Sequence, residues 1–249
     1  MAGPQDVSID AVVFDLFGTL VPEFPKAEFY EVIREMAGVL GADPDAFEDE
    51  WMRTAIARQT GAYPGGVREN VAAVCAAVGA GAEPAALDAA LEPRVALYDR
   101  WFHPRPGALE TLAALKERRY PVALISMCAP DTPALWRASE LAPFVDVEVF
   151  SSEVGLRKPD PAIYRLACNG LGVEPEACLY CGDGAYGELS GAAAVGMTVY
   201  LISDPALEPS EALRPEGEDW DGARVGDLRE LLDVLPPRRQ AEATPGSSP

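Results

Sequence analysis

Short apolar runs recur along the chain, and longer segments of helical periodicity separate them. The first run, residues 9–15, ends at Asp15, and further runs lie at 122–126, 145–151, 177–181 and 197–202. Strands buried on both faces of a parallel sheet have this continuous apolar character. Helical patterns follow at 106–118, 161–171 and 187–195. This alternation predicts an α/β fold with a Rossmann-like, doubly wound parallel sheet.

Between the first run and Pro106 the pattern changes to consecutive helices without a strand. The helical segments are 26–40, 45–59, 67–78 and 85–101. We therefore predict an α/β core from residues 1–22 and 104–235 and an all-helical cap from residues 23–103. Loops that follow parallel strands lie at the edge of the sheet where ligands bind, so the cap would cover the site. Residues 236–249 are rich in Pro, Arg, Ser and Gly, and we expect a disordered tail there.

The chain is strongly acidic, since 40 acidic and 20 basic side chains give 249 residues a formal charge of −20. Nucleic acids and anionic membranes bind clustered Lys and Arg, so we expect neither partner. A small anionic substrate remains compatible, because one metal ion and one lysine can dominate a local field. We expect no membrane span and no signal peptide. The five scattered cysteines fit a reducing cytoplasm, and the oligomeric state stays open.

Polar residues stand at the ends of the apolar runs, where a parallel sheet would bring them together. Asp15 precedes a Gly-Thr turn, Ser126 ends the second run, and Asp183 lies between two glycines. A carboxylate held at a strand tip can attack phosphorus or carbon and form a covalent intermediate. Lys158 would keep that carboxylate ionised and offset an anionic substrate. Asp15 and Asp183 could share Mg²⁺, which binds through one or two carboxylates together with waters and phosphate oxygens.

Four sequence motifs, in order, resemble those of the haloacid-dehalogenase-like superfamily. They are Asp-Leu-Phe-Gly-Thr-Leu from Asp15, the run ending at Ser126, Gly-Leu-Arg-Lys-Pro-Asp-Pro around Lys158, and Gly-Asp-Gly around Asp183. The resemblance covers nearly the whole chain. It implies a hydrolase in which Asp15 is the nucleophile, Ser126 and Lys158 assist, and Thr19 contacts the nucleophile or substrate. It also implies a magnesium site formed by Asp15, Asp183 and the backbone carbonyl of Phe17.

Several other residues have both a functional and a structural interpretation. Arg53 and Arg58 lie on the predicted cap helix and could bind a substrate anion, or they could form a solvated helix face. His103 is the only histidine, and we expect it to have a structural role. Glu188 could support the metal site or cap the helix that follows it.

Phe17 departs from the pattern of the phosphatases that this chain resembles, which carry a second Asp at this position to protonate the leaving oxygen. Phenylalanine cannot move a proton, and general acid–base catalysis contributes about 10²–10⁴ in rate. We therefore expect a slow phosphatase or one restricted to good leaving groups. Dehalogenases of the superfamily also lack that Asp, because a halide leaves without a proton.

The fourth motif favours the metal-dependent members, since dehalogenases resemble Ser-Ser-Asn where this chain has Cys-Gly-Asp at Asp183. Three interpretations remain open. The chain is a magnesium-dependent phosphatase of a small metabolite, a 2-haloacid dehalogenase or other carbon-centred hydrolase, or a non-catalytic, regulatory relative.

Overall fold

Six parallel strands form one sheet in the computed structural model, which describes residues 8–63, 65–203, 213 and 215–237. Across the sheet the strands are β3 (Val147–Phe150), β2 (Val122–Ser126), β1 (Ala11–Phe14), β4 (Cys178–Gly182), β5 (Thr198–Ile202) and β6 (Ala223–Val225). The chain winds outward from β1 on one side and outward from β4 on the other. The predicted doubly wound sheet is confirmed, and its direction reverses between β1 and β4, where such sheets bind ligands.

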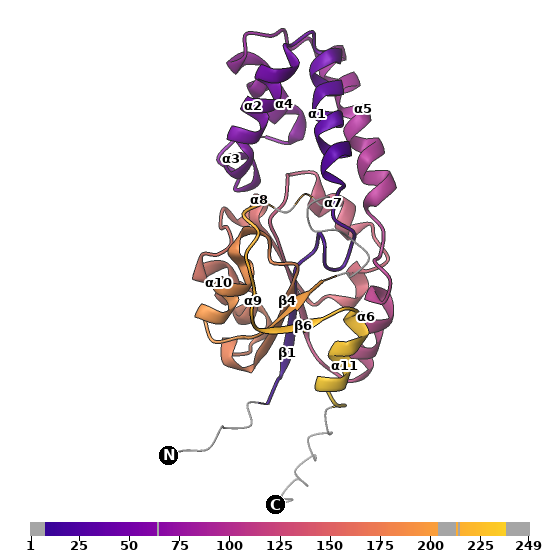
Figure 1. Ribbon diagram of the computed structural model, residues 1–249, viewed down its shortest axis with the longest axis vertical. Coiled ribbons are helices and arrows are strands. Elements are labelled where there is room, and N and C mark those ends of the chain that lie inside the picture. Colours follow the sequence, from indigo (N-terminus) through magenta and orange to yellow (C-terminus); the bar gives the residue numbers. More distant parts are fainter. Residues whose placement is uncertain (1–7, 64, 204–212, 214, 238–249) are drawn as a thin grey trace, which may run out of the picture.

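Helices cover both faces of the sheet, and the side chains of β1 alternate between the two hydrophobic layers. Val12 and Phe14 pack on one side, and Ala11 and Val13 pack on the other. One face is covered by α9 (Pro161–Leu171) and α10 (Glu188–Ala194), and the opposite face by α6 (Ala108–Glu117) and α11 (Leu231–Val234) (Figure 1). Short helices α7 (Thr132–Arg137) and α8 (Ser151–Val154) follow β2 and β3. All of β1 is therefore buried, and only its carboxyl end can present a group to a ligand.

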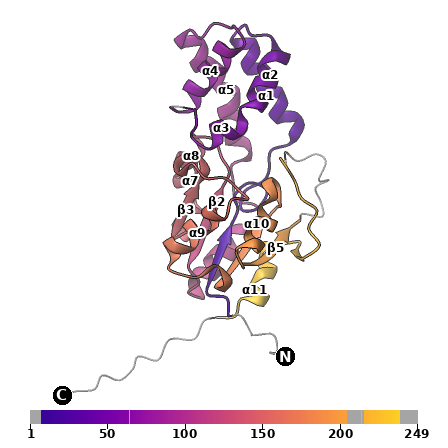
Figure 2. The same ribbon diagram turned by 90° about the vertical axis from the view of Figure 1, so that its left-hand side faces the viewer.

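Five helices follow β1 and lie beyond the carboxyl ends of the strands. This helical insert consists of α1 (Lys26–Val39), α2 (Pro44–Arg53), α3 (Ala55–Gln59), α4 (Val67–Ala77) and α5 (Pro84–Trp101). It has a hydrophobic cluster of its own, in which Met36, Phe47 and Val74 are buried. Figures 1 and 2 both show the insert at the end of the molecule opposite α11. The insert therefore stands over the edge of the sheet at which β1 ends.

The observed elements differ from the predicted ones at several places, and the short helices α7, α8 and α11 were not predicted. The predicted helix at 45–59 is broken at Thr54, whose hydroxyl donates to the Glu50 carbonyl at 2.7 Å, a local bond that competes with regular helix. Strand β6 was not predicted, because its three residues at the sheet edge are mostly exposed and form no apolar run. The predicted tail at 236–249 lies outside the described residues from 238 onward.

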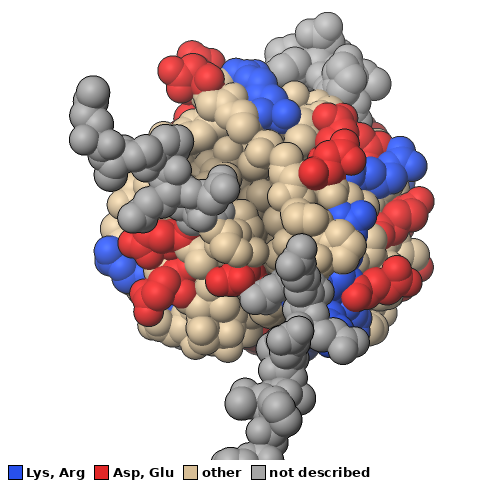
Figure 3. Space-filling view, turned by 90° about the horizontal axis from the view of Figure 1, so that it is seen from below, with Lys and Arg blue, Asp and Glu red and all other residues tan. Residues whose placement is uncertain are grey.

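The face of the molecule seen in Figure 3 has no basic patch in the part of the chain that the structure describes, as expected for an acidic protein. There, Lys and Arg side chains are interspersed with Asp and Glu around the edge of the face. Among the helices that the structure describes, none has the length and apolar character to cross a bilayer.

A tight turn after β1 brings the first and fourth motifs together. Gly18 has φ +75°, in the left-handed region that favours glycine. A Cβ atom at this position would lie 2.8 Å from Asp183 Oδ2. The turn therefore requires glycine both for its backbone conformation and for the close approach of Asp183.

We expect Gly18→Ala to destabilise the protein by about 1–3 kcal/mol, because it adds a left-handed alanine and a steric clash. Gly38→Ala is the matched control, since Gly38 lies in α1 and a Cβ there would meet no atom within 4 Å. The control should stabilise the protein by about 0.5–1 kcal/mol. Urea unfolding of both variants measures the difference, and equal stability of the two would contradict this account of the turn.

Candidate active site

The polar residues of the four motifs meet at the carboxyl edge of the sheet. Asp15 directly follows β1, and its backbone N–H donates to the Cys181 carbonyl of β4 at 3.0 Å. Ser126 is the last residue of β2, and Asp183 directly follows β4. Lys158 lies in the loop before α9, close to the Asp160 side chain that caps that helix. The strands on both sides of β1 thus contribute one polar residue each beside Asp15.

Lys158 connects the nucleophile candidate to a second carboxylate. Its Nζ lies 2.6 Å from Asp15 Oδ1 and 2.5 Å from Glu188 Oε2, and its side chain is only 1% exposed. Burial opposes the charge on Lys158, but the two carboxylates outweigh burial and raise the pKa of the ammonium group above its ordinary value. Burial and the charge of Glu188 raise the pKa of Asp15 to about 7, while Lys158 acts in the opposite direction. The lysine is therefore the group that favours an ionised Asp15.

Glu188 is buried in the first turn of α10 and has a partner for both carboxylate oxygens. Oε2 accepts the Lys158 ammonium and the Tyr180 hydroxyl, the latter at 2.7 Å, and Oε1 accepts the Gly184 N–H at 2.9 Å. A Cβ atom at position 182 would lie 2.1 Å from Oε1, so Gly182 makes room for this carboxylate. Glu188 thus orients Lys158, a role that neither of its sequence-based interpretations included.

Asp15, Asp183 and Glu188 offer carboxylate oxygens that lie within 4.8 Å of one another. Glu188 already accepts three hydrogen bonds, so Asp15 and Asp183 are better placed to bind a cation. One Asp183 oxygen accepts the Ala185 N–H at 2.9 Å, which orients this carboxylate. Three carboxylates lie close together here, two of them bound to one lysine, and a hard divalent cation with oxygen ligands would offset the excess negative charge. The residues present therefore fit Mg²⁺.

Two buried hydroxyl groups near Asp15 lack ordinary partners. Thr19 Oγ1 and Ser126 Oγ are fully buried without a hydrogen bond of normal geometry, although the Cys128 thiol is close enough to Ser126 to interact with it. A buried hydroxyl without a partner is costly, so such groups commonly mark a ligand position. Neither residue forms part of the wall of the cavity described next.

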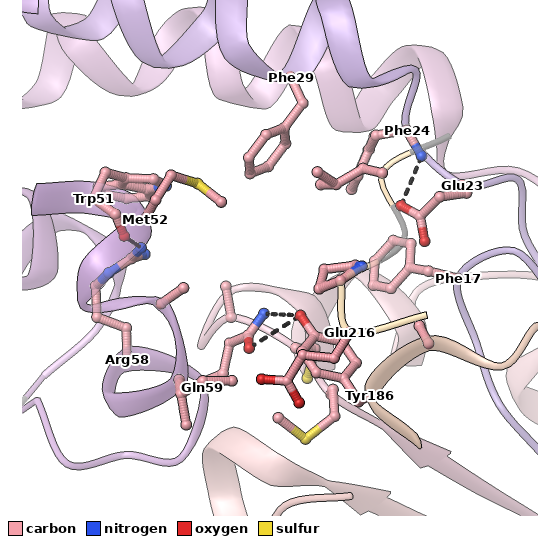
Figure 4. Close-up of a pocket in the computed structure, with 18 of the residues that line it drawn as sticks. Phe17, Glu23, Phe24, Phe29, Trp51, Met52, Arg58, Gln59, Tyr186 and Glu216 are labelled. Atoms are coloured by element: carbon pink, nitrogen blue, oxygen red, sulfur yellow. Dashed lines mark hydrogen bonds between the residues drawn. The ribbon is translucent and has the colours of Figure 1, made fainter. Parts of the chain in front are cut away.

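A cavity of about 240 Å³ lies between Asp15 and the helical insert. Its wall is mainly apolar and aromatic, as Figure 4 shows, and includes Phe17, Phe24, Phe29, Trp51, Met52 and Tyr98. The ring of Phe17 lies 5.2 Å from that of Phe24 and also packs against Tyr98 and Phe102. The aromatic residue at this position therefore belongs to a cluster that joins the turn after β1 to the insert.

The two arginines predicted to bind substrate have different environments. Arg58 lines the cavity, is 4% exposed, and stacks on Trp51 with its guanidinium carbon 3.6 Å from the ring centroid. It donates to Thr54 Oγ1 and the Trp51 carbonyl, pairs with no carboxylate in the described chain, and its pKa falls to about 9 through burial. The side chain of Arg53 is 70% exposed and pairs with Glu50 at 2.6 Å. The structure thus brings Arg58, and not Arg53, to the site.

Two contacts connect the insert to the core on either side of the cavity. Gln59 Nε2 donates to the Tyr186 hydroxyl at 3.1 Å, and Arg94 binds both carboxylate oxygens of Asp131 at 2.8 and 2.9 Å. Bidentate contacts of this kind fix orientation as well as distance. His103 is exposed and does not line this cavity, so it lacks the packed position on which its expected structural role was based.

Glu23 is a cavity residue that the sequence pattern did not indicate. One of its carboxylate oxygens accepts the Phe24 N–H at 2.8 Å, and the side chain lines the cavity beside Phe17 (Figure 4). Burial, followed by the charge of Asp183, raises the pKa of Glu23 well above its ordinary value. The only sequence signal is one acidic residue in the otherwise apolar segment from Leu20 to Pro25.

A family model described as haloacid dehalogenase-like hydrolase matches residues 9–196. The chain is 29% identical over 234 residues to glyceraldehyde 3-phosphate phosphatase of Methanopyrus kandleri, across 91% of this chain and 97% of that one. It is 31% identical over 131 residues to (S)-2-haloacid dehalogenase 4A of Burkholderia cepacia, about half of each chain at 52% and 54%.

The structure of a HAD phosphatase from Thermococcus onnurineus superimposes with a TM-score of 0.65 over 93% of this chain and 100% of that one. Its sequence identity of 20% supports the likeness of fold alone. The family model, in contrast, spans well over half of this chain and includes all four motifs. The protein therefore belongs to the haloacid dehalogenase-like hydrolases.

Proposed function

We propose that this hydrolase is a magnesium-dependent phosphatase of a small phosphorylated metabolite and acts through an aspartyl-phosphate on Asp15. The observation that carries the proposal is the contact of the buried Lys158 with Asp15, beside the second carboxylate of Asp183. A carboxylate nucleophile, a fixed cation and a pair of oxygen ligands for a metal are the groups that phosphoryl transfer needs.

In the proposed reaction, Asp15 attacks phosphorus and the bond between phosphorus and the leaving oxygen breaks. Lys158 holds Asp15 ionised and offsets negative charge on the phosphoryl group. The hydroxyls of Thr19 and Ser126 donate to phosphoryl oxygens, which would give both buried groups the partners they lack. Water then attacks phosphorus, the bond to Asp15 breaks, and phosphate leaves.

Asp15, Asp183 and the Phe17 carbonyl would hold Mg²⁺. When bound, Mg²⁺ neutralises charge on the transferring phosphoryl group. Glu188 stays outside this ligand set, because its oxygens accept the lysine, the Tyr180 hydroxyl and the Gly184 N–H. Its part is to keep Lys158 directed at Asp15.

Arg58 is expected to bind an anionic group of the substrate at the cavity wall. A buried guanidinium without a carboxylate partner gains most from such a ligand. The small, mainly apolar cavity favours a compact metabolite. The free state of all five cysteines supports a reducing cytoplasm as the place where it acts.

Carbon–halogen cleavage is the second candidate, and Phe17 is the observation that favours it, because a halide leaves without a proton. The paired carboxylates of Asp15 and Asp183 favour the phosphatase instead. Halide release from a 2-haloacid without any metal would support the dehalogenase and contradict the phosphatase.

Asp15→Asn should lower phosphoester turnover by about 10⁴-fold or more, because the amide is nearly isosteric but not nucleophilic. The matched control is Asp10→Asn, which changes an aspartate just before the start of the same strand and should retain the wild-type rate. Phosphate release measures both variants. Appreciable turnover by Asp15→Asn would exclude this residue as nucleophile.

Asp183→Asn should weaken Mg²⁺ binding and raise the magnesium concentration needed for half-maximal activity by at least about tenfold. Calorimetry with inorganic phosphate present measures the affinity directly. Glu216→Gln removes a different cavity carboxylate, one paired with Arg157 at 3.0 Å, and should leave the affinity unchanged. If the wild-type protein binds no Mg²⁺, the proposal fails in favour of the dehalogenase.

Arg58→Met should raise KM by about 10–100-fold with a smaller effect on kcat, since loss of a charged hydrogen bond to substrate costs about 1.5–3 kcal/mol. Arg53→Met removes the exposed arginine of the pair and should leave KM unchanged. Steady-state kinetics on one good substrate compare the two. An equal effect of both substitutions would mean that Arg58 does not contact the substrate.

A further inference from the structure

The proposed phosphatase lacks a proton donor at the expected position, because Phe17 stands there and its ring packs into an aromatic cluster. An alcohol leaving from phosphorus needs a proton from another group. His103 is exposed outside the cavity, and Glu188 is occupied by Lys158, Tyr180 and the Gly184 N–H. Burial raises the pKa of Tyr186 to about 12, which makes it a weak acid, and its hydroxyl is bound to Gln59.

Glu23, unlike these residues, has a carboxylate that lies in the cavity and is not bound by a cation or by another side chain among the described residues. Its carboxylate lines the same cavity as Asp15 and Phe17, and the Phe24 N–H holds one oxygen at 2.8 Å. In Figure 4 the carboxylate lies beside the Phe17 ring, across the cavity from Arg58. Glu23 has no ion pair in the described chain and does not belong to the group of oxygens within 4.8 Å of one another at the candidate metal site.

We propose that Glu23 is the general acid and base of this enzyme and that it replaces the carboxylate missing at position 17. This inference rests on the proposed phosphatase function. Glu23 lies eight residues after the nucleophile, whereas the missing carboxylate would lie two residues after it. Phe17 packs on Phe24, the residue next to Glu23, and Phe17 and Glu23 line the same cavity.

Every proton is accounted for over the two steps of the reaction. Asp15 forms a bond to phosphorus, the bond to the leaving oxygen breaks, and that oxygen takes the Glu23 proton. In the second step the Glu23 carboxylate takes a proton from the attacking water, the new P–O bond forms, and the bond to Asp15 breaks. Glu23 ends protonated, as it began, and one water is consumed for each alcohol and phosphate released.

The surroundings of Glu23 favour the protonated form that the first step needs. Burial is the largest cause that raises the pKa of Glu23; the charges of Asp183, Asp15 and Glu188 act in the same direction, and the Phe24 N–H acts against them. A cation bound by Asp15 and Asp183 would offset their charges, and burial would still favour the protonated acid. The Tyr186 side chain also lines this cavity, and Lys158 is bound to two other carboxylates. A carboxylic acid in this position would stay protonated at a higher pH than an exposed glutamate.

The test compares wild type and Glu23→Gln on benzyl phosphate and 4-nitrophenyl phosphate, two aromatic esters that differ mainly in the acidity of the leaving group. Glutamine keeps the size and the bond to the Phe24 N–H but cannot give a proton. We expect kcat/KM for benzyl phosphate to fall by about 10²–10⁴-fold and that for nitrophenyl phosphate to fall less than tenfold. In wild type, kcat/KM for benzyl phosphate should decline as pH rises past the pKa of Glu23, and the variant should lose this decline.

Glu216→Gln is the control for removing a cavity carboxylate, and it should leave the ratio between the two substrates at the wild-type value. Thermal unfolding checks that Glu23→Gln is folded, and Glu23→Asp should recover part of the benzyl phosphate rate if the shorter side chain still reaches. Equal loss on both substrates, or no loss on benzyl phosphate, would overturn the role of Glu23. If wild type hydrolyses neither ester while it releases halide from a 2-haloacid, the proposed phosphatase fails as well.

Discussion

The ammonium group of Lys158, buried between Asp15 and Glu188, is the interaction on which the site depends. It joins three elements that are distant in sequence: the end of β1, the loop before α9, and the first turn of α10. Removing one partner from a buried ion pair leaves an uncompensated charge, which costs about 3–5 kcal/mol. The Tyr180 hydroxyl and the Gly184 N–H also bind Glu188, so this carboxylate is held in place and in turn fixes the position of Lys158.

This arrangement also explains why the site suits a cation and an anion at once. Lysine neutralises only part of the charge on the surrounding carboxylates, and that excess is what a divalent metal would offset. Lys158 and a cation held by Asp15 and Asp183 would then both offset negative charge on the phosphoryl group. Above them, Gln59 with Tyr186 and Arg94 with Asp131 hold the helical insert against the core, so Arg58 and the aromatic wall keep a defined position over Asp15.

The sequence allowed prediction of the parts of the site that follow from strand order. Asp15, Ser126 and Asp183 each end or follow an apolar run, and parallel strands bring such positions to one edge regardless of the loops between them. Glu23 could not be found in this way, because its place depends on how the turn after Gly18 packs against the insert. The separate roles of Arg53 and Arg58 also required the structure. In one continuous helix, a spacing of five residues would place the two side chains about 140° apart. Here the helix is interrupted at Thr54, between the two arginines, so their positions did not follow from the spacing.

The central claim is that phosphorus becomes bonded to Asp15, and acid quenching during turnover of a phosphoester radiolabelled on phosphorus tests it most directly. The account predicts label bound to the protein, labile to hydroxylamine, and located in the peptide that contains Asp15. Replacing Lys158 with Met should sharply reduce the rate at which that label appears. Release of labelled phosphate in the first turnover, with no label on the protein at any quench time, would contradict the account.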